Sequence, residues 1–263
     1  MYKGKENVQK MNEVYSYPAY YEIAFSYRDV PQEVDVLDQV IKQHSRIPVT
    51  KMLDLACGPA PHLTELVRRG YEYIGLDQSP AMLAYAREKA RVIHAPARFV
   101  QADMADFALG EQVDFAFVLL GSLQAGSRAD LVAHFDSLGR SLKRGGLYFL
   151  DWCVRFSPAS TSTESWDMTT GKTAVRATYQ TELVNPVEQL YQETLTLVVV
   201  DQDTSLELEE TDLVRAIYPQ EFLLMIETRS DFEFVGWWND WDLAQPLDGT
   251  EEISRPITIL RRV

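Results

Sequence analysis

The 263-residue chain is 46% hydrophobic and 24% charged, and its 39 Asp and Glu against 25 Lys and Arg give a net charge of −14. Its apolar content predicts a packed globular protein of one or two domains rather than a disordered or fibrous one. An acidic surface repels phosphate backbones and anionic lipids, so we expect no nucleic-acid partner and no membrane partner. A homodimer is compatible with this composition.

The cysteine and histidine content bears on the expected compartment of the protein and on whether it binds a metal. Two cysteines, Cys57 and Cys153, are too few for a disulfide framework and favour a reducing compartment. The N-terminal segment lacks the apolar core of a secretion signal, and no apolar run reaches the roughly 18 residues of a membrane-spanning helix. We therefore expect a cytoplasmic protein. The four histidines lack metal-ligand spacing, so no metal site is expected.

The first half of the chain alternates strands with helices. Three helical patterns are predicted. The first follows the first strand and ends at Gly70, the second begins at Ser79-Pro80 and runs to about Arg91, and the third begins at Ser127 and ends at 143–145. Strands apolar on both faces, alternating with helices, predict a parallel sheet covered on both sides. The expected strands are 51–56, 71–77, 98–102, 113–120 and 147–152.

The pattern changes after Trp152. Apolar residues recur with period two, at Val175, Ala177 and Tyr179 and again at 195–199, with turns predicted at Asn185-Pro186 and 201–203. This predicts a small antiparallel sheet inserted into the first domain. A helix at about 220–228 and strands at 232–238 and 256–262 follow. These last two strands are linked too closely for a helical crossover and should pair antiparallel.

Three acidic residues lie at the predicted carboxyl ends of successive strands, where open α/β sheets bind ligands. Asp54 precedes a small-residue turn, Ala56 to Pro61, that contains one glycine, Gly58. Asp77 ends the second strand, where a carboxylate can accept hydrogen bonds from both hydroxyls of a ribose. Asp103 follows the third strand and could accept from an exocyclic amine, with the thioether of Met104 on a purine face. Each acid alone could equally be a solvated turn residue.

The stretches MLDLACGPAPH, IGLDQSPAML, FVQADM and LKRGGLYFLDW resemble class I S-adenosylmethionine-dependent methyltransferases, of the small-molecule type with an inserted antiparallel β-sheet. The resemblance is strong over 50–152 and moderate over 217–263. It implies S-adenosylmethionine as the cofactor and a Rossmann-like, doubly wound α/β fold. The sheet should have seven mostly parallel strands, the last antiparallel. The methyltransferase domain would comprise 1–154 and 217–263, and the inserted β-sheet subdomain 155–216.

The same resemblance assigns roles around the cofactor. Asp54 and the turn through Gly58 would lie against the methionine part, Asp77 would hold the ribose, and Asp103 would meet the adenine amine. The remaining cofactor-binding candidates are Ala56, Gln78, Met82, Met104 and Leu119. The chain departs from the family at Ala56 and Ala60, where glycine is frequent, and alanine is tolerable there if φ stays negative.

Other segments resemble parts of the family that cover the cofactor and the acceptor. In the N-terminal segment, Tyr21, Tyr27 and Arg28 are candidates for the cofactor, although these aromatics could instead fix a terminal helix to the core. Arg215 and Tyr218 could face the acceptor or have structural roles. The Trp-rich segment 236–241, with Trp152 opposite, could line an acceptor pocket or pack in the core. His62, at the start of the first helix, is expected to be partly exposed.

These expectations together predict methyl transfer to a small molecule, most readily to a nitrogen of an amine or amino sugar. Transfer from a sulfonium depends largely on alignment, so no catalytic base is assigned. The alternatives are an O- or C-methyltransferase, a protein that binds S-adenosylmethionine without transfer, a nicotinamide-dependent oxidoreductase, and an interaction scaffold. The oxidoreductase is disfavoured because Pro61 interrupts the dinucleotide glycine pattern.

Overall fold

The computed structural model describes residues 9–11, 13–157, 161–202, 204–249 and 252–263. The chain forms two compact units, one of Asp29–Pro158 with Arg215–Val263 and a smaller one of Met1–Arg28 with Ala159–Val214. We expected residues 1–28 to belong to the larger domain. In the structure, the described residues from 13 to 28 group with the inserted sheet, because the aromatic side chains of this segment pack against its strands.

The larger unit is built on an eight-stranded sheet in the order β12-β11-β13-β6-β5-β2-β3-β4. The strands from β6 to β4 run parallel, and β13 pairs antiparallel with both β6 and β11, which confirms the predicted end of the sheet. The eighth strand, β12, was not predicted because it is short and half-exposed. The strands are β2 Lys51–Leu55, β3 Glu72–Asp77, β4 Ala97–Gln101, β5 Val113–Val118, β6 Leu142–Asp151, β11 Phe232–Asn239, β12 Asp242–Pro246 and β13 Pro256–Arg262.

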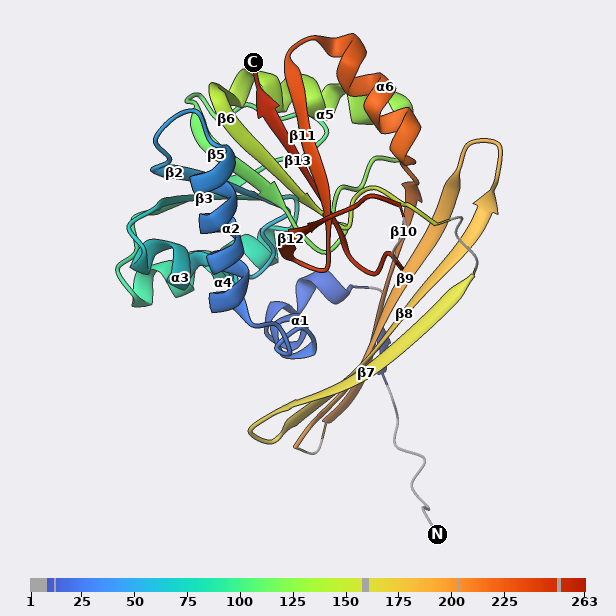
Figure 1. Ribbon diagram of the computed structural model, residues 1–263. Coiled ribbons are helices and arrows are strands. Elements are labelled where there is room, and N and C mark those ends of the chain that lie inside the picture. Colours follow the sequence, from blue (N-terminus) through green and yellow to red (C-terminus); the bar gives the residue numbers. More distant parts are fainter. Residues whose placement is uncertain (1–8, 12, 158–160, 203, 250–251) are drawn as a thin grey trace. The chain divides into compact units, whose positions relative to one another are not determined.

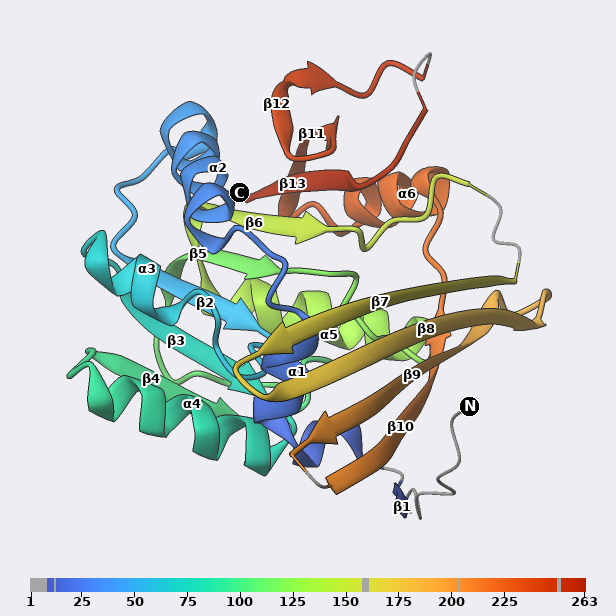
Figure 2. The ribbon, with the colours of Figure 1, turned by 90° about the horizontal axis from the view of Figure 1, so that it is seen from below.

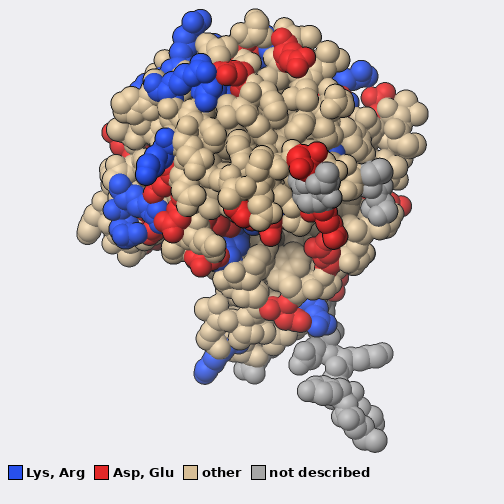
Figure 3. Space-filling view, viewed as in Figure 1, with Lys and Arg blue, Asp and Glu red and all other residues tan. Residues whose placement is uncertain are grey.

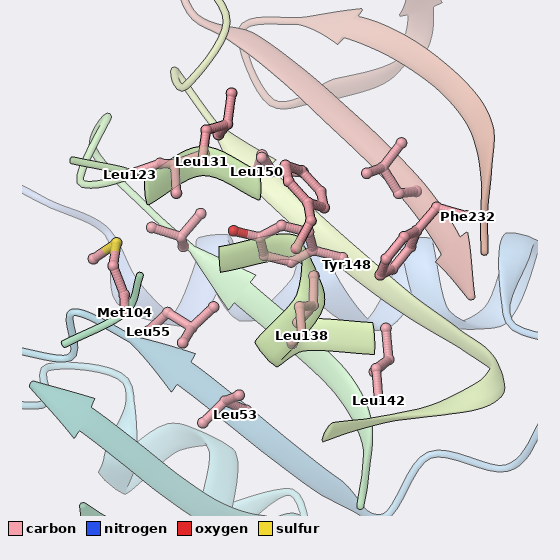
Figure 4. Packing of buried hydrophobic residues seen from close by; sticks show 14 of the residues in the cluster. Leu53, Leu55, Met104, Leu123, Leu131, Leu138, Leu142, Tyr148, Leu150 and Phe232 are labelled. Carbon is pink, nitrogen blue, oxygen red and sulfur yellow. The ribbon is translucent and has the colours of Figure 1, made fainter. Parts of the chain in front are cut away.

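Helices cover both faces of this sheet, so its central strands are buried on both sides (Figure 1). One face carries α2 Val30–His44, α3 Leu63–Arg68 and α4 Pro80–Val92. The other carries α5 Arg128–Ser141 and α6 Pro219–Arg229. Figure 4 shows the core under α5, where the ring of Tyr148 lies among leucines. The sequence analysis did not predict α2.

The boundary between α5 and β6 differs from the prediction. The helix ends at Ser141 and the strand begins at Leu142, whereas the helix was expected to close at 143–145. The glycines at 145 and 146 serve the strand instead. A Cβ on Gly146 would lie 2.5 Å from the carbonyl oxygen of Asp114, so glycine permits the close approach of β6 to β5.

The smaller unit is a five-stranded sheet in the order β1-β10-β9-β8-β7, with its long strands side by side in Figure 2. Period-two burial holds for Val175, Ala177 and Thr181 but ends before Leu183, which is 37% exposed. The predicted turns follow β8 and β9; Asp203 lies outside the described residues. Its elements are β1 Gln9–Met11, η1 Val14–Ser16, α1 Pro18–Ala24, β7 Ser162–Thr170, β8 Thr173–Asn185, β9 Leu190–Asp201 and β10 Thr204–Arg215.

Charged side chains of both signs are mixed on the face shown in Figure 3, rather than gathered in one basic stripe. Several of them form ion pairs, such as Arg68 with Glu65 and Arg69 with Asp38. Among the described residues, no helix combines the length and the apolar character that a membrane crossing would need.

Candidate cofactor site

The strand order of the larger unit reverses between β2 and β5, and we call the edge of the sheet between the loops that follow these two strands the crevice. From β2 the chain builds outward through β3 and β4 on one side, then returns to place β5 and β6 on the other. Loops that leave β2 and β5 at their carboxyl ends therefore diverge, and open α/β sheets bind ligands at such a switch in strand order. One wall is the turn Ala56–Pro61 after β2, and the other is the turn Leu119–Gly121 after β5.

Asp77 and Gly58 are brought together at this crevice. The Gly58 N–H donates to Asp77 Oδ2 at 2.8 Å, and the Ser79 N–H donates to Asp77 Oδ1 at 2.8 Å. Burial raises the pKa of the Asp77 carboxyl, while these backbone donors act in the opposite direction. Each carboxylate oxygen can accept a further hydrogen bond. The group that ends β3 is thus oriented by the backbone and can still accept from a hydroxyl pair.

The turn after β2 contains three left-handed residues. Alanine is tolerable in place of the glycine that is frequent in the family if φ stays negative, but φ is +53° at Ala56 and +51° at Ala60, beside +51° at Gly58. A left-handed alanine costs roughly 1–2 kcal/mol because its Cβ crowds the following carbonyl. The condition for a tolerated alanine is therefore not met at either position, and the turn holds both residues in the left-handed region.

Left-handed residues also follow β5 and β6, the next two strands of the sheet on one side of β2. Leu120 has φ +56° and Gly121 +68° after β5, and Trp152 has φ +61° after β6. Bulky residues in this region are uncommon and concentrate at functional sites, where surrounding structure holds them. Three adjacent strands therefore end in constrained backbone on the same edge of the sheet.

The three predicted carboxylates differ in burial. Asp54 is 4% exposed and accepts a hydrogen bond from the Tyr73 hydroxyl at 2.6 Å. Burial raises the pKa of Tyr73, and the Asp54 charge adds to the effect. Asp103 is exposed and accepts from the Ala105 N–H at 2.7 Å. Asp54 thus supports the turn from the core, Asp77 lines its edge, and Asp103 faces solvent.

The predicted adenine neighbours are mostly in the core. Met82 is 1% exposed and Met104 is 7% exposed, whereas Gln78 is exposed. The carbonyl of Met104 accepts from Nδ1 of His134 at 2.8 Å, which ties the loop after β4 to α5. This bond fixes the position of the backbone on either side of Asp103.

The acceptor candidates separate into exposed and packed groups. Trp152 is 47% exposed, while Trp238 is 8% exposed and packs against His44. Arg215 ends β10, is 7% exposed and forms an ion pair with Glu221 of α6. Tyr218 directly precedes α6. Of the aromatic candidates in this unit, Trp152 keeps the ring accessible to a ligand.

Tyr21, Tyr27 and Arg28 belong to the smaller unit. The ring of Tyr21 lies 4.5 Å from that of Phe25, and Tyr27 makes an edge contact with Trp166 at 6.1 Å. Phe25 and Trp166 also pack edge to face, at 5.6 Å. These contacts fit the packing alternative, and the assignment of the three residues to the cofactor stays a prediction.

Sequence reasoning missed four charged or titratable residues beside the crevice. His62 was expected to be partly exposed but is 1% exposed, with Nε2 2.8 Å from Glu33 Oε2. Asp151 is fully buried and pairs with Arg255. Their signal in the sequence was weak, because Glu33 and Arg255 lie far from the matched stretches. Asp151 lies within LYFLDW, where an acid after four apolar residues could have been noticed.

The sequence and the fold were compared with those of known proteins. Residues 52–146 match the family described as Methyltransferase domain. The solved structure of the sugar N-methyltransferase KedS8 from a Streptoalloteichus species superimposes with a TM-score of 0.71 at 21% identity, over 100% of this chain and 98% of that one. Residues 52–146 are thus similar in sequence to a methyltransferase domain. The fold of the chain is that of the class I methyltransferases, as the resemblance implied.

Two curated relatives match the region of the methyltransferase domain. One is the dTDP-3-amino-3,4,6-trideoxy-alpha-D-glucopyranose N,N-dimethyltransferase of Streptomyces venezuelae, 29% identical over 44% of this chain and 47% of the relative. The other is the trans-aconitate 2-methyltransferase of an Enterobacter strain, 34% identical over 34% of this chain and 35% of the relative. The chain thus spans less than half the length of these curated relatives.

Proposed function

We propose that the protein is an S-adenosylmethionine-dependent methyltransferase that binds its cofactor in the crevice between β2 and β5. The observation that carries this proposal is the Asp77 carboxylate, held by the N–H groups of Gly58 and Ser79 at the end of β3. A carboxylate oriented in this way suits the vicinal hydroxyls of an adenosyl ribose. The match of residues 52–146 to the methyltransferase family supports the same assignment.

The chemistry requires alignment more than a strong base. When bound, S-adenosylmethionine supplies an activated methyl group that a nucleophile attacks in line. Placing the two reacting atoms ~3–3.5 Å apart can contribute roughly 7–11 kcal/mol in favourable cases. The residues at the crevice would bind and orient the cofactor and exclude water. The ring of Trp152, exposed at the end of β6, offers an apolar face that can hold a cationic amine.

For the acceptor, we propose a nitrogen of a small amine or amino sugar. Support comes from the sugar N-methyltransferase structure and from the N,N-dimethyltransferase of Streptomyces venezuelae. The alternative is an oxygen or carbon acceptor, and the match to a trans-aconitate 2-methyltransferase supports it because trans-aconitate contains no nitrogen. A neutral amine attacks directly, whereas a hydroxyl benefits from a nearby base, and no such base has been assigned at the crevice.

The cofactor assignment is tested by calorimetry with S-adenosylmethionine on the wild type and on Asp77→Asn. The amide of asparagine cannot accept from both Gly58 and Ser79, and it loses one acceptor for the ribose, so the loss should be about 1–3 kcal/mol, or roughly 5- to 150-fold in Kd. Asp114→Asn is the matched control, because Asp114 is buried at the amino end of β5. Equal affinity in all three proteins would contradict the assignment.

The acceptor assignment is tested with labelled S-adenosylmethionine and paired acceptors that differ in one group. Each pair should consist of an amino sugar nucleotide and the same compound with a hydroxyl in place of the amine. Transfer to the amine alone supports the proposal, and transfer to the hydroxyl alone contradicts it. Tight cofactor binding without transfer to any acceptor in a broad panel would favour a binding protein.

A further inference from the structure

An ion pair with a buried carboxylate lies beside the crevice, apart from the groups assigned to the cofactor: the side chain of Asp151 is 0% exposed and that of Arg255 is 22% exposed. Asp151, the last residue of β6, is fully buried. Arg255 donates to it twice, from Nε at 2.8 Å and from Nη2 at 2.6 Å. Trp241 donates from Nε1 to Asp151 at 3.0 Å, and the Arg255 guanidinium lies 4.9 Å from the centre of the Trp241 ring. This is a bidentate, charge-assisted pair with a stacked aromatic.

On one side, the pair holds the turn after β5. The Leu120 N–H donates to Asp151 Oδ2 at 2.9 Å, and the Gly121 N–H donates to the Asp151 carbonyl at 3.0 Å. Leu120 is left-handed, with φ +56°. A leucine stays in that conformation only where neighbouring groups impose it. Asp151 therefore supplies a contact that holds this wall of the crevice in place.

On the other side, the pair reaches the turn after β2. Arg255 Nη2 lies 3.8 Å from Glu33 Oε1, and Glu33 Oε2 lies 2.8 Å from His62 Nε2. His62 follows the turn Ala56–Pro61 directly and is 1% exposed. One continuous set of polar contacts thus runs from Leu120 through Asp151, Arg255 and Glu33 to His62, and it joins both walls.

Stability alone does not account for this network. Burying a charge costs several kcal/mol, and well-packed apolar residues of similar volume are often as stable as a buried ion pair. We propose that Asp151 and Arg255 are positioning residues that fix the spacing of the two crevice walls, and through it the affinity for S-adenosylmethionine, without contacting the cofactor. This inference rests on the cofactor site proposed above.

The test measures the Kd of S-adenosylmethionine by calorimetry and the free energy of unfolding for two matched variants. Asp151→Asn keeps the side-chain shape but replaces one acceptor oxygen with a donor, so the Leu120 or the Arg255 contact is lost. Loss of such a contact should weaken binding by roughly 3- to 30-fold. Asp114→Asn is the control. Asp114 is 2% exposed, accepts from the N–H groups of Thr50 and Lys51 at 2.9 Å and pairs with Lys143 at 2.6 Å.

Both variants lose a buried, ion-paired carboxylate. The two carboxylates lie on the adjacent parallel strands β5 and β6, Asp114 near the amino end of β5 and Asp151 at the carboxyl end of β6. We expect both to lower stability and only Asp151→Asn to lower affinity. Adding Leu120→Gly to Asp151→Asn should restore part of the affinity, because glycine adopts the left-handed φ without the Asp151 contact. A merely structural role predicts no such rescue. If Asp151→Asn does not fold, Arg255→Lys, which keeps the charge and loses the bidentate geometry, should weaken binding in the same direction.

Wild-type affinity in Asp151→Asn or in a folded Arg255→Lys would overturn the inference, as would an equal loss of affinity in Asp114→Asn. If Asp77→Asn binds weakly while Asp151→Asn binds normally, the cofactor site stands and the positioning role falls. If the wild type itself does not bind S-adenosylmethionine, the proposed function falls, and this inference falls with it.

Discussion

The buried histidine of α5 predicts how the protein responds to acid. His134 is 1% exposed, with Nδ1 2.8 Å from the Met104 carbonyl and Nε2 2.9 Å from the Tyr148 hydroxyl. A carbonyl can only accept, so Nδ1 carries the hydrogen and the neutral ring accepts at Nε2. Burial lowers the pKa of His134 to about 4, against the opposing effect of the Met104 bond.

Because its folded pKa lies below the ordinary value of 6.5, His134 binds a proton more readily in the unfolded chain. Its contribution to stability is therefore present above pH 6.5 and is lost as the pH falls toward 4. With those two pKa values, lowering the pH from 7 to 5 removes about 2 kcal/mol of unfolding free energy.

The assay is urea unfolding at several pH values between 7 and 5, for the wild type, His134→Asn and His94→Asn. Asparagine at 134 can still donate to Met104 but does not titrate, so we expect the pH dependence to flatten by about 2 kcal/mol. His94 is exposed in the turn after α4, so His94→Asn is the control for the loss of one histidine. Parallel curves for the wild type and His134→Asn would refute the reasoning.

Two glycine exchanges test the backbone geometry. Ala60→Gly should change the unfolding free energy by less than about 1 kcal/mol, because relief of left-handed strain offsets the lost methyl and the added entropy of the unfolded chain. Ala86→Gly, inside α4, has no such strain to relieve and should lower the unfolding free energy by about 2 kcal/mol. An equal cost for both alanines, measured by urea unfolding, would contradict the φ assignment. Gly146→Ala should lower the unfolding free energy by more than about 2 kcal/mol, because the added Cβ meets the Asp114 carbonyl. At Gly171 an added Cβ would have no described atom within 4 Å beyond its chain neighbours, so Gly171→Ala should lower the unfolding free energy by only about 1 kcal/mol, through backbone strain. A Gly146→Ala protein as stable as Gly171→Ala would contradict the close approach of β6 to β5.

Features with a local cause could be predicted from the sequence. The alternation of buried runs such as Val113–Val118 with helical patterns predicted the parallel sheet, because burial on both faces leaves few polar positions. The Ser79 and Ser127 caps were confirmed by bonds from the N–H groups of Met82 and Asp130. Asp77 was placed correctly at the end of its strand because the strand itself was correctly predicted.

Features that depend on contacts distant in the sequence could not be predicted. The backbone at Ala56 and Ala60 is set by how the turn joins β2 to α3, and alanine carries no signal for a left-handed φ. His62 is buried because Glu33, on a helix that was not predicted, lies against it. Asp151 acquires its role from Arg255, which is over one hundred positions away in the sequence.

The most direct test of the central claim is a crystal structure of the protein with S-adenosylhomocysteine, the product form of the cofactor. We expect the adenosyl group in the crevice between β2 and β5, with both ribose hydroxyls donating to the Asp77 carboxylate. An adenosyl group bound elsewhere, or a ribose that does not contact Asp77, would contradict this expectation.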